Sequence, residues 1–208
     1  MDGAPLSPQA KSYHAVITSD DGGRVSAAVV RFLMTEIESS LGAKTLSEIA
    51  ITADVAHYIT EPPGRMINEL DASAFFRATR LHLDDTTAED IFYKAGQRMA
   101  RYLLRSRIPT SLTGLSSLLP RLLRESILTS NMLSQAYLFI PRERFKPSIR
   151  LAPRFSLKKN PLPSPNGAWH CGMFDTIYRA VVGGGYRFTR LTERDGDDLI
   201  ETFAAKRA

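Results

Sequence analysis

The sequence predicts an α+β fold in which several N-terminal helices are followed by a small antiparallel sheet with one embedded helix. Apolar residues recur at helical spacing up to about residue 136. From residue 137 onward, short β-like runs alternate with Pro or Gly, interrupted by one helical segment. A length of 208 residues suits one domain with a substantial core. We therefore predict a flexible arm at 1–22, which lacks periodicity, and a single domain at 23–208.

Two helices are expected before the Pro-Pro-Gly break at 62–64. Residues 24–42 place Val25, Val29 and Ile37 on one face and end in Gly42, which suits a C-cap. Residues 46–59 continue as a second amphipathic segment.

Two further helices are expected at 72–83 and 84–108. Asp71 or Ser73 can cap the first, and Thr87 with Asp90 has the three-residue spacing of a capping arrangement in the second. Gly96 inside the second helix costs about 1 kcal/mol relative to Ala, which indicates close packing against another helix.

The C-terminal half begins with a helix at 120–136, which has Pro120 in its first turn and follows the apolar stretch at 110–119. We predict β-runs at 137–140, 145–152, 154–158 and 185–191 and one helix at 168–182. The three glycines at 183–185 favour a C-cap and turn, because they lack the spacing of a dinucleotide fingerprint and precede a strand.

Several functional classes have no support in the sequence. A single cysteine excludes an intrachain disulfide and a Cys-rich zinc or iron-sulfur site, and no two histidines have the spacing of a shared metal site. There is no P-loop and no Gly-x-Ser-x-Gly elbow, and the acidic pairs at 84–85 and 197–198 suit helix starts or a turn. No apolar run reaches eighteen residues and the first residues do not form a secretory signal, so we expect a cytoplasmic protein.

The net charge of +5 and the pI near 9.5 would favour nucleic acid, an anionic membrane surface or a carboxylate-bearing ligand. A solvated basic face that keeps the protein soluble explains the charge equally well. Few aromatic residues interleave with the arginines, so no nucleic-acid partner is expected. Peripheral membrane contact stays open.

The start of the 168–182 helix is the main candidate for a ligand site. It brings together a nitrogen ligand, a thiol and flat aromatic surface, which a planar aromatic ligand with a coordinating centre could use. Core packing is the preferred explanation for each of these residues taken alone. The candidate residues are Trp169, His170, Cys171, Phe174 and Tyr178.

Five segments, in order from about residue 22 to 190, resemble the bacteriochlorophyll 4-vinyl reductase family. This family is the founding group of the proteins that contain a vinyl-4-reductase domain. The segments are GGRVSAAVVRFL, AHYITEPPGRMINELDASAFFRATR, AGQRMARYLLRSRIP, LLPRLLRESILTSNMLSQAYLF and KKNPLPSPNGAWHCGMFDTIYRAVV. The resemblance implies a fold similar to TRAPP vesicle-tethering subunits and haem-based NO-sensing proteins, in which helices and a sheet enclose an apolar ligand.

The resemblance also implies a role in bacteriochlorophyll biosynthesis, with a magnesium tetrapyrrole such as divinyl protochlorophyllide as ligand. Leu115 and Leu119 would then belong to an apolar wall, Arg105 and Arg107 would pair with a propionate, and His170 is the preferred axial ligand of the metal. Pathway enzymes such as magnesium chelatase or a methyltransferase are the implied protein partners, and a homodimer stays open.

This sequence departs from the family pattern after residue 185, where it has no cysteine, so we expect no structural zinc. It also lacks a flavin, nicotinamide or iron-sulfur motif, so no intrinsic cofactor is expected. We therefore favour a tetrapyrrole-binding carrier or accessory factor over a vinyl reductase that uses an external electron donor. A sensory or scaffold module for another small aromatic ligand is the third alternative.

Overall fold

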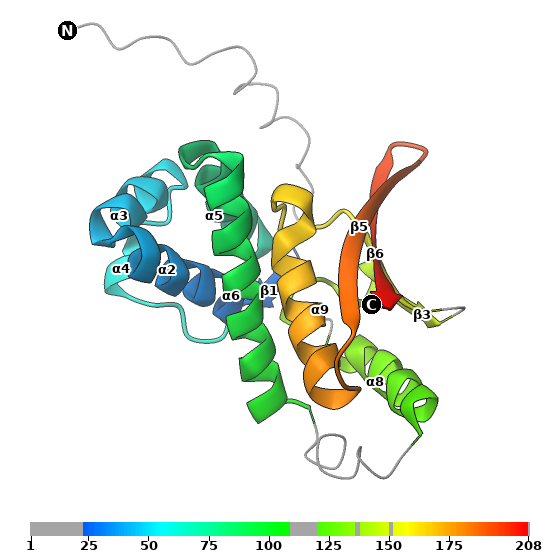
Figure 1. The fold of residues 1–208 in the computed structure, drawn as a ribbon. Coiled ribbons are helices and arrows are strands. Elements are labelled where there is room, and N and C mark those ends of the chain that lie inside the picture. Colours follow the sequence, from blue (N-terminus) through cyan, green and yellow to red (C-terminus); the bar gives the residue numbers. More distant parts are fainter. Residues whose placement is uncertain (1–22, 109–119, 136–137, 150–151, 208) are drawn as a thin grey trace, which may run out of the picture.

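The computed structural model describes residues 23–108, 120–135, 138–149 and 152–207, in which helices of the N-terminal half pack beside a four-stranded antiparallel sheet (Figure 1). The helix α9, embedded between strands in the sequence, lies between α6 and the sheet (Figure 1). The predicted α+β class is thus confirmed, and the four-stranded sheet follows the N-terminal helices. Two short strands among these helices were not predicted. The predicted arm at 1–22 lies outside the described residues.

The elements of the N-terminal half surround a two-stranded antiparallel ribbon. They are β1 (Arg24–Ser26), α2 (Ala27–Leu41), α3 (Ala43–Thr52), α4 (His57–Thr60), β2 (Met66–Asn68), α5 (Glu69–His82) and α6 (Asp85–Ser106). The elements of the C-terminal half build and cover the larger sheet. They are α8 (Arg121–Gln135), η3 (Arg142–Arg144), β3 (Phe145–Ile149), β4 (Pro153–Lys158), η4 (Pro165–Gly167), α9 (Ala168–Val181), β5 (Tyr186–Asp195) and β6 (Asp198–Arg207).

The first helix ends as predicted and begins later. Gly42 has a φ of 90° and its N–H bonds to the Glu38 carbonyl, so it is the C-cap of α2. Residues 24–26, predicted to be helical, form β1 and pair with β2. The side chain of Ser26 accepts a hydrogen bond from the N–H of Ala28 and so starts the helix after the strand.

The predicted helix at 46–59 is wrong, because two helices, α3 and α4, share this region. Asp54 takes a left-handed conformation, with a φ of 58°, and the helical hydrogen-bond pattern stops there. The N–H of Val55 bonds back to the Ala50 carbonyl and closes the turn.

The predicted cap of α5 is also wrong, because Asn68 starts this helix and its side chain accepts from the N–H of Leu70. Ser73 is buried inside the helix. Asp71 lies in the first turn, where it accepts a hydrogen bond from the Tyr58 phenol at 2.7 Å.

The N-cap of α6 is Asp84 rather than the predicted Thr87 and Asp90. The Asp84 carboxylate accepts hydrogen bonds from the N–H groups of Thr86 and Thr87, and these bonds hold its pKa below the usual range. Asp90 forms an ion pair with Lys94 one turn further on. The acidic pair at 84–85 is therefore a helix start, as predicted.

Close packing at Gly96 is confirmed. A Cβ at this position would lie 2.0 Å from the Trp169 carbonyl oxygen, and a Cβ on Gly172 of α9 would lie 2.2 Å from the Tyr93 carbonyl oxygen. The two helices therefore touch backbone to backbone, each through its own glycine. They run side by side in the same direction (Figure 1).

The larger sheet has the order β3-β4-β6-β5, with every neighbouring pair antiparallel. The strand predicted at 137–140 is wrong for its described residues, since residue 138 is in a 3₁₀ conformation and residues 139–140 form a turn and a bend. The sequence interpretation missed β6 altogether, although its alternate residues Glu201, Phe203 and Ala205 are buried. The acidic residues at 197–198 lie at the turn of the β5-β6 hairpin.

None of the helices in the described part of the chain is both long enough and apolar enough to cross a membrane.

Candidate ligand site around the α9 helix

The start of α9 is shaped by a short turn. Asn166 and Gly167 both have positive φ, at 49° and 67°, which turns the chain from η4 into the helix. A Cβ on Gly167 would lie 2.4 Å from the ring of Phe203, so the turn packs directly onto β6. Ser164 accepts a hydrogen bond from the Trp169 N–H at 3.2 Å and thereby anchors the first turn.

Three of the predicted site residues lie on one face of α9. His170, Phe174 and Tyr178 are four residues apart and point at the sheet, because residues at this spacing share a helix face. The rings of His170 and Phe174 lie 4.8 and 5.9 Å from the ring of Phe203. The Tyr178 hydroxyl shares a hydrogen bond of 2.5 Å with Thr129 of α8.

His170 is fully buried and, among the described residues, neither of its ring nitrogens has a hydrogen-bond partner. Burial lowers its pKa to about 3, with a smaller contribution from the positive charge of Arg190. The imidazole is therefore neutral at physiological pH and keeps an unshared electron pair on one nitrogen. A buried polar group without a partner is unfavourable, so this side chain calls for a physical explanation.

Trp169 and Cys171 leave α9 in other directions. The Trp169 ring contacts Phe76 of α5 at 6.0 Å and Phe139 at 6.2 Å, and its indole N–H has no partner within the described segments. Cys171 Sγ lies 4.0 Å from the Asn166 carbonyl oxygen. Burial, followed by the charge of Asp175, raises the pKa of this thiol to about 12.

The predicted arginines do not join these residues. Arg105 and Arg107 are exposed at the C-terminal end of α6, whereas His170 lies at the N-terminal end of the parallel helix α9 (Figure 1). They are therefore at opposite ends of the helix pair. Leu115 and Leu119 lie outside the described residues.

A cleft of about 610 Å³ opens on the other side of α9. Its floor is the face of α9 that carries Ala168, Cys171 and Asp175, one wall is α6 with Glu89 and Tyr93, and the other wall is β5. Its size is within the usual range for a small-ligand site. The β5 wall comprises Arg187, Phe188, Thr189, Arg190 and Thr192.

Asp175 connects the floor of the cleft to both walls. Its carboxylate accepts hydrogen bonds from the Tyr93 phenol at 2.8 Å and from the Phe188 N–H at 2.7 Å, and Arg187 Nη1 lies 3.8 Å away. Burial raises the pKa of Asp175, although both donors and the two nearby arginines, Arg187 and Arg179, oppose the shift. The sequence interpretation missed this cluster, because its members come from three separate elements.

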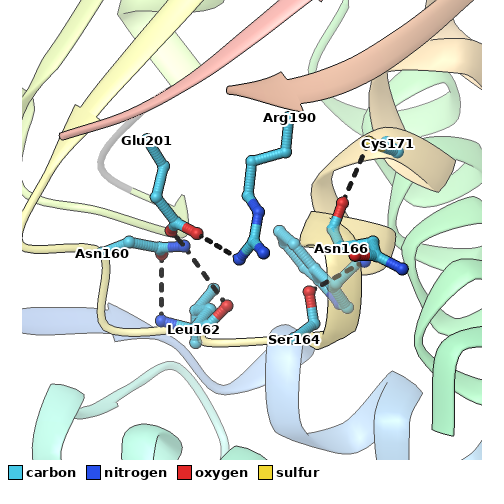
Figure 2. A network of polar contacts seen from close by, with 8 residues as sticks. Asn160, Leu162, Ser164, Asn166, Cys171, Arg190 and Glu201 are labelled. Carbon is cyan, nitrogen blue, oxygen red and sulfur yellow. Dashed lines mark hydrogen bonds and ion pairs between the residues drawn. The ribbon is translucent and has the colours of Figure 1, made fainter. Parts of the chain in front are cut away.

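A buried polar network lies beside the cleft (Figure 2). Glu201 of β6 accepts from Arg190 Nη1 at 2.8 Å and from Asn160 Nδ2 at 2.5 Å (Figure 2). Asn160 Oδ1 accepts the N–H of Leu162 at 3.0 Å, which holds the loop in place. The Arg190 side chain thus connects the cleft lining to the sheet interior.

These geometries suit binding better than nucleophilic chemistry. The Cys171 thiol is protonated at neutral pH, because its pKa is about 12. Tyr93 also has a pKa of about 12, raised by burial and by its bond to Asp175. In the residues that the structure describes, no group of three His, Cys, Asp or Glu side chains could hold a metal ion.

No family model matches the chain, and no curated protein is significantly similar in sequence. Among solved structures, the fold is similar to that of a point mutant of an H-NOX protein from K. algicida in its Fe(II) unliganded form. The TM-score is 0.55, with 8% sequence identity, over 88% of this chain and 97% of that chain. The likeness at this identity establishes a shared fold alone.

Proposed function

We propose that this protein binds a magnesium tetrapyrrole of the divinyl protochlorophyllide type and passes it to another protein of bacteriochlorophyll biosynthesis. In this role it is a carrier or accessory factor rather than a self-sufficient enzyme. Two observations support the proposal: the ordered resemblance of five segments to the bacteriochlorophyll 4-vinyl reductase family, and the chemistry of His170.

The observation that carries the proposal is the buried imidazole of His170, whose nitrogens have no partner in the described residues. A neutral imidazole is a good metal ligand and needs no proton release to bind. A ring nitrogen of His170 is therefore suited to bind the magnesium of a tetrapyrrole. Such a group, when bound, would supply a Lewis-acidic magnesium, which His170 would ligate.

Space next to His170 depends on Phe139. The Phe139 ring lies 6.1 Å from the His170 ring and 6.2 Å from Trp169, between the helix and the start of the sheet. Phe139 lies in a turn outside any helix or strand, although its ring is fully buried and packs edge-on against Phe145 at 5.5 Å. Displacement of this side chain would open the face of His170 that a macrocycle needs.

Arg190 is a better candidate than Arg105 or Arg107 to pair with a propionate group of the tetrapyrrole. Arg190 is close enough to affect the pKa of His170, whereas the other two arginines are at the far end of α6. Its side chain is 30% exposed and already bonded to Glu201, so its guanidinium is held in place and keeps further donors.

A titration of the purified protein with divinyl and monovinyl protochlorophyllide, followed by absorbance and fluorescence, tests the proposal. We expect saturable, red-shifted binding near one-to-one stoichiometry. His170→Leu should remove the spectral shift, and Phe139→Ala should strengthen binding. His57→Leu is the matched control, because His57 is exposed on α4. An unchanged spectrum with every macrocycle, or equal binding by His170→Leu, would contradict the proposal.

A sensory module for an iron tetrapyrrole is the second candidate, since the similar fold belongs to a protein whose structure contains Fe(II). The same titration with iron protoporphyrin separates the two. Tighter binding of the iron compound, with a Soret shift that disappears in His170→Leu, would favour sensing over transport.

A further inference from the structure

We propose that the cleft between α6 and β5 binds an extended peptide segment of a partner protein, which adds as a fifth strand to the edge of the sheet and places a Lys or Arg side chain against α6. The two proposed sites share Arg190, which lines the cleft, but the cleft is not lined by His170 or Phe139, on which the tetrapyrrole proposal depends.

The first argument is topological. β5 is the last strand in the order β3-β4-β6-β5, so one of its edges has no neighbouring strand. The N–H of Phe188 donates to the Asp175 carboxylate at 2.7 Å and therefore points away from β6. The N–H and C=O groups of successive residues in a strand point to opposite edges. Those of Arg190, Thr192 and Arg194 therefore point outward, as those of Phe188 do.

The outward groups beyond Phe188 are available. Within the described parts of the chain, no hydrogen bond reaches the main-chain groups of Arg190, Thr192 or Arg194 from outside the β5-β6 hairpin. Asp175 thus occupies the outer edge of β5 at Phe188, and the outer edge at residues 190–194 has no partner among the described residues. An open edge pairs readily with an extended chain.

The second argument is the shape of the cleft. Four consecutive residues, 187–190, line it together with Thr192. Successive side chains of a strand point to opposite faces of the sheet, so one face alone cannot present all of them. The cleft therefore runs along the edge of β5, where a ligand would meet main-chain donors and acceptors.

The third argument is charge, which identifies the occupant. The face of α6 toward Arg187 carries Asp85 and Glu89, together with Asp90, which is paired with Lys94. These residues form a second hollow that continues from the cleft through Glu89, Tyr93 and Arg187, and the Arg187 guanidinium is itself 3.8 Å from the Asp175 carboxylate. A strand added to β5 would point every second side chain toward this acidic wall. A basic side chain at that position is complementary, and an acidic one is repelled.

A proline substitution separates edge pairing from folding. Thr192→Pro removes an outward N–H and no ladder hydrogen bond, and proline is tolerated on an edge strand in this position. Thr192→Ala removes the same side chain and keeps the N–H, so it is the matched control. Both variants should retain the circular dichroism spectrum and thermal midpoint of a folded domain.

The probe is a phage-displayed library of random decapeptides, selected on the full chain and then tested as synthetic peptides by fluorescence anisotropy. We expect enriched peptides with Lys or Arg flanked by β-branched residues. Binding should weaken at least about tenfold in Thr192→Pro and stay within about twofold in Thr192→Ala.

Asp85→Asn should weaken binding by up to about fivefold, whereas Glu61→Gln, an exposed acidic control on the α4 side, should not change it. Failure to enrich any peptide would overturn the proposal. So would peptides that bind Thr192→Pro as well as the parent protein, or enrichment of acidic peptides. Tetrapyrrole binding should be unchanged in Thr192→Pro, so the two proposals fail separately.

Discussion

The phenol of Tyr93 donates a hydrogen bond of 2.8 Å to Asp175, and this contact joins the wall and the floor of the cleft across 82 residues of sequence. The other carboxylate oxygen of Asp175 holds the Phe188 N–H at the start of β5. One side chain therefore fixes the relative positions of α6, α9 and the sheet edge. The cleft depends on this arrangement.

Tyr93→Phe should lower the free energy of unfolding by about 1 kcal/mol, since one partly buried hydrogen bond to a charged group is lost. Asp175→Ala should cost about 2 to 3 kcal/mol, because it leaves the buried Phe188 N–H without an acceptor. Urea unfolding measures both. Tyr102→Phe is the control, since the ring of Tyr102 packs on Phe32. Equal stability of Tyr93→Phe and Tyr102→Phe would contradict the prediction.

Gly96→Ala should destabilise the domain by about 1 to 3 kcal/mol or more, because its Cβ would lie 2.0 Å from a main-chain oxygen that cannot move without shifting α9. Gly172→Ala should behave alike for the reciprocal reason. Gly184→Ala is the matched control, with nothing within 4 Å of the added carbon. Thermal unfolding of the three variants tests the prediction, and a Gly96→Ala midpoint as high as that of Gly184→Ala would refute it.

The helices were predictable where one physical signal dominates. The periodicity of α2 led to a correct core face, with Val29 and Ile37 buried, and the isolated glycine at 96 led to a correct helix contact. Caps were less predictable, since Asn68 and Asp84 begin their helices before the residues with the expected spacing. Both caps are local side-chain bonds to the first turn of the helix, and Asp71 instead accepts from the Tyr58 phenol.

The cleft was not predictable from sequence patterns. Tyr93, Asp175 and Arg187 are each ordinary in their own segments, and they come together because α9 packs against both α6 and β5. The missed strand β6 had a usable signal, the alternation of Glu201, Phe203 and Ala205, but its charged flanks resemble a helix start or a turn. The aromatic residues of α9 were recognised, but their division between the sheet and α5 follows from the fold.

Cys171 should react very slowly with a thiol reagent in the native protein. At pH 8 a thiol with a pKa of about 12 is ionised in about one molecule in ten thousand, compared with about a quarter for an ordinary thiol. We expect labelling by 5,5′-dithiobis(2-nitrobenzoate) at least about a hundredfold slower than in urea. A Cys171→Ser/Ala43→Cys double variant, with its thiol on an exposed residue, provides the fast reference. Comparable native rates would show that the thiol is accessible and ionised.

His170 should make the stability of the protein fall in mild acid. Its pKa is about 3 in the folded state and about 6.5 in an unfolded chain, so the unfolded state binds the proton more readily between these values. The contribution of the neutral imidazole is fully present above about pH 6.5. It is lost as the pH falls toward 3, by about 1.4 kcal/mol per pH unit.

A comparison of the parent with His170→Leu separates the pH dependence due to His170 from that due to other titratable groups. Asp175 contributes with the opposite sign, since its raised pKa makes the folded state the better proton acceptor. His170→Leu keeps Asp175 and removes only the imidazole, so the unfolding free energy of the parent should fall steadily relative to that of the variant from pH 6.5 to 4.5. His57→Leu retains His170 and should keep the parent slope. A parallel pair of curves for the parent and His170→Leu would show that the imidazole is accessible to protons in the folded protein, which would also remove the basis for its role as a neutral metal ligand.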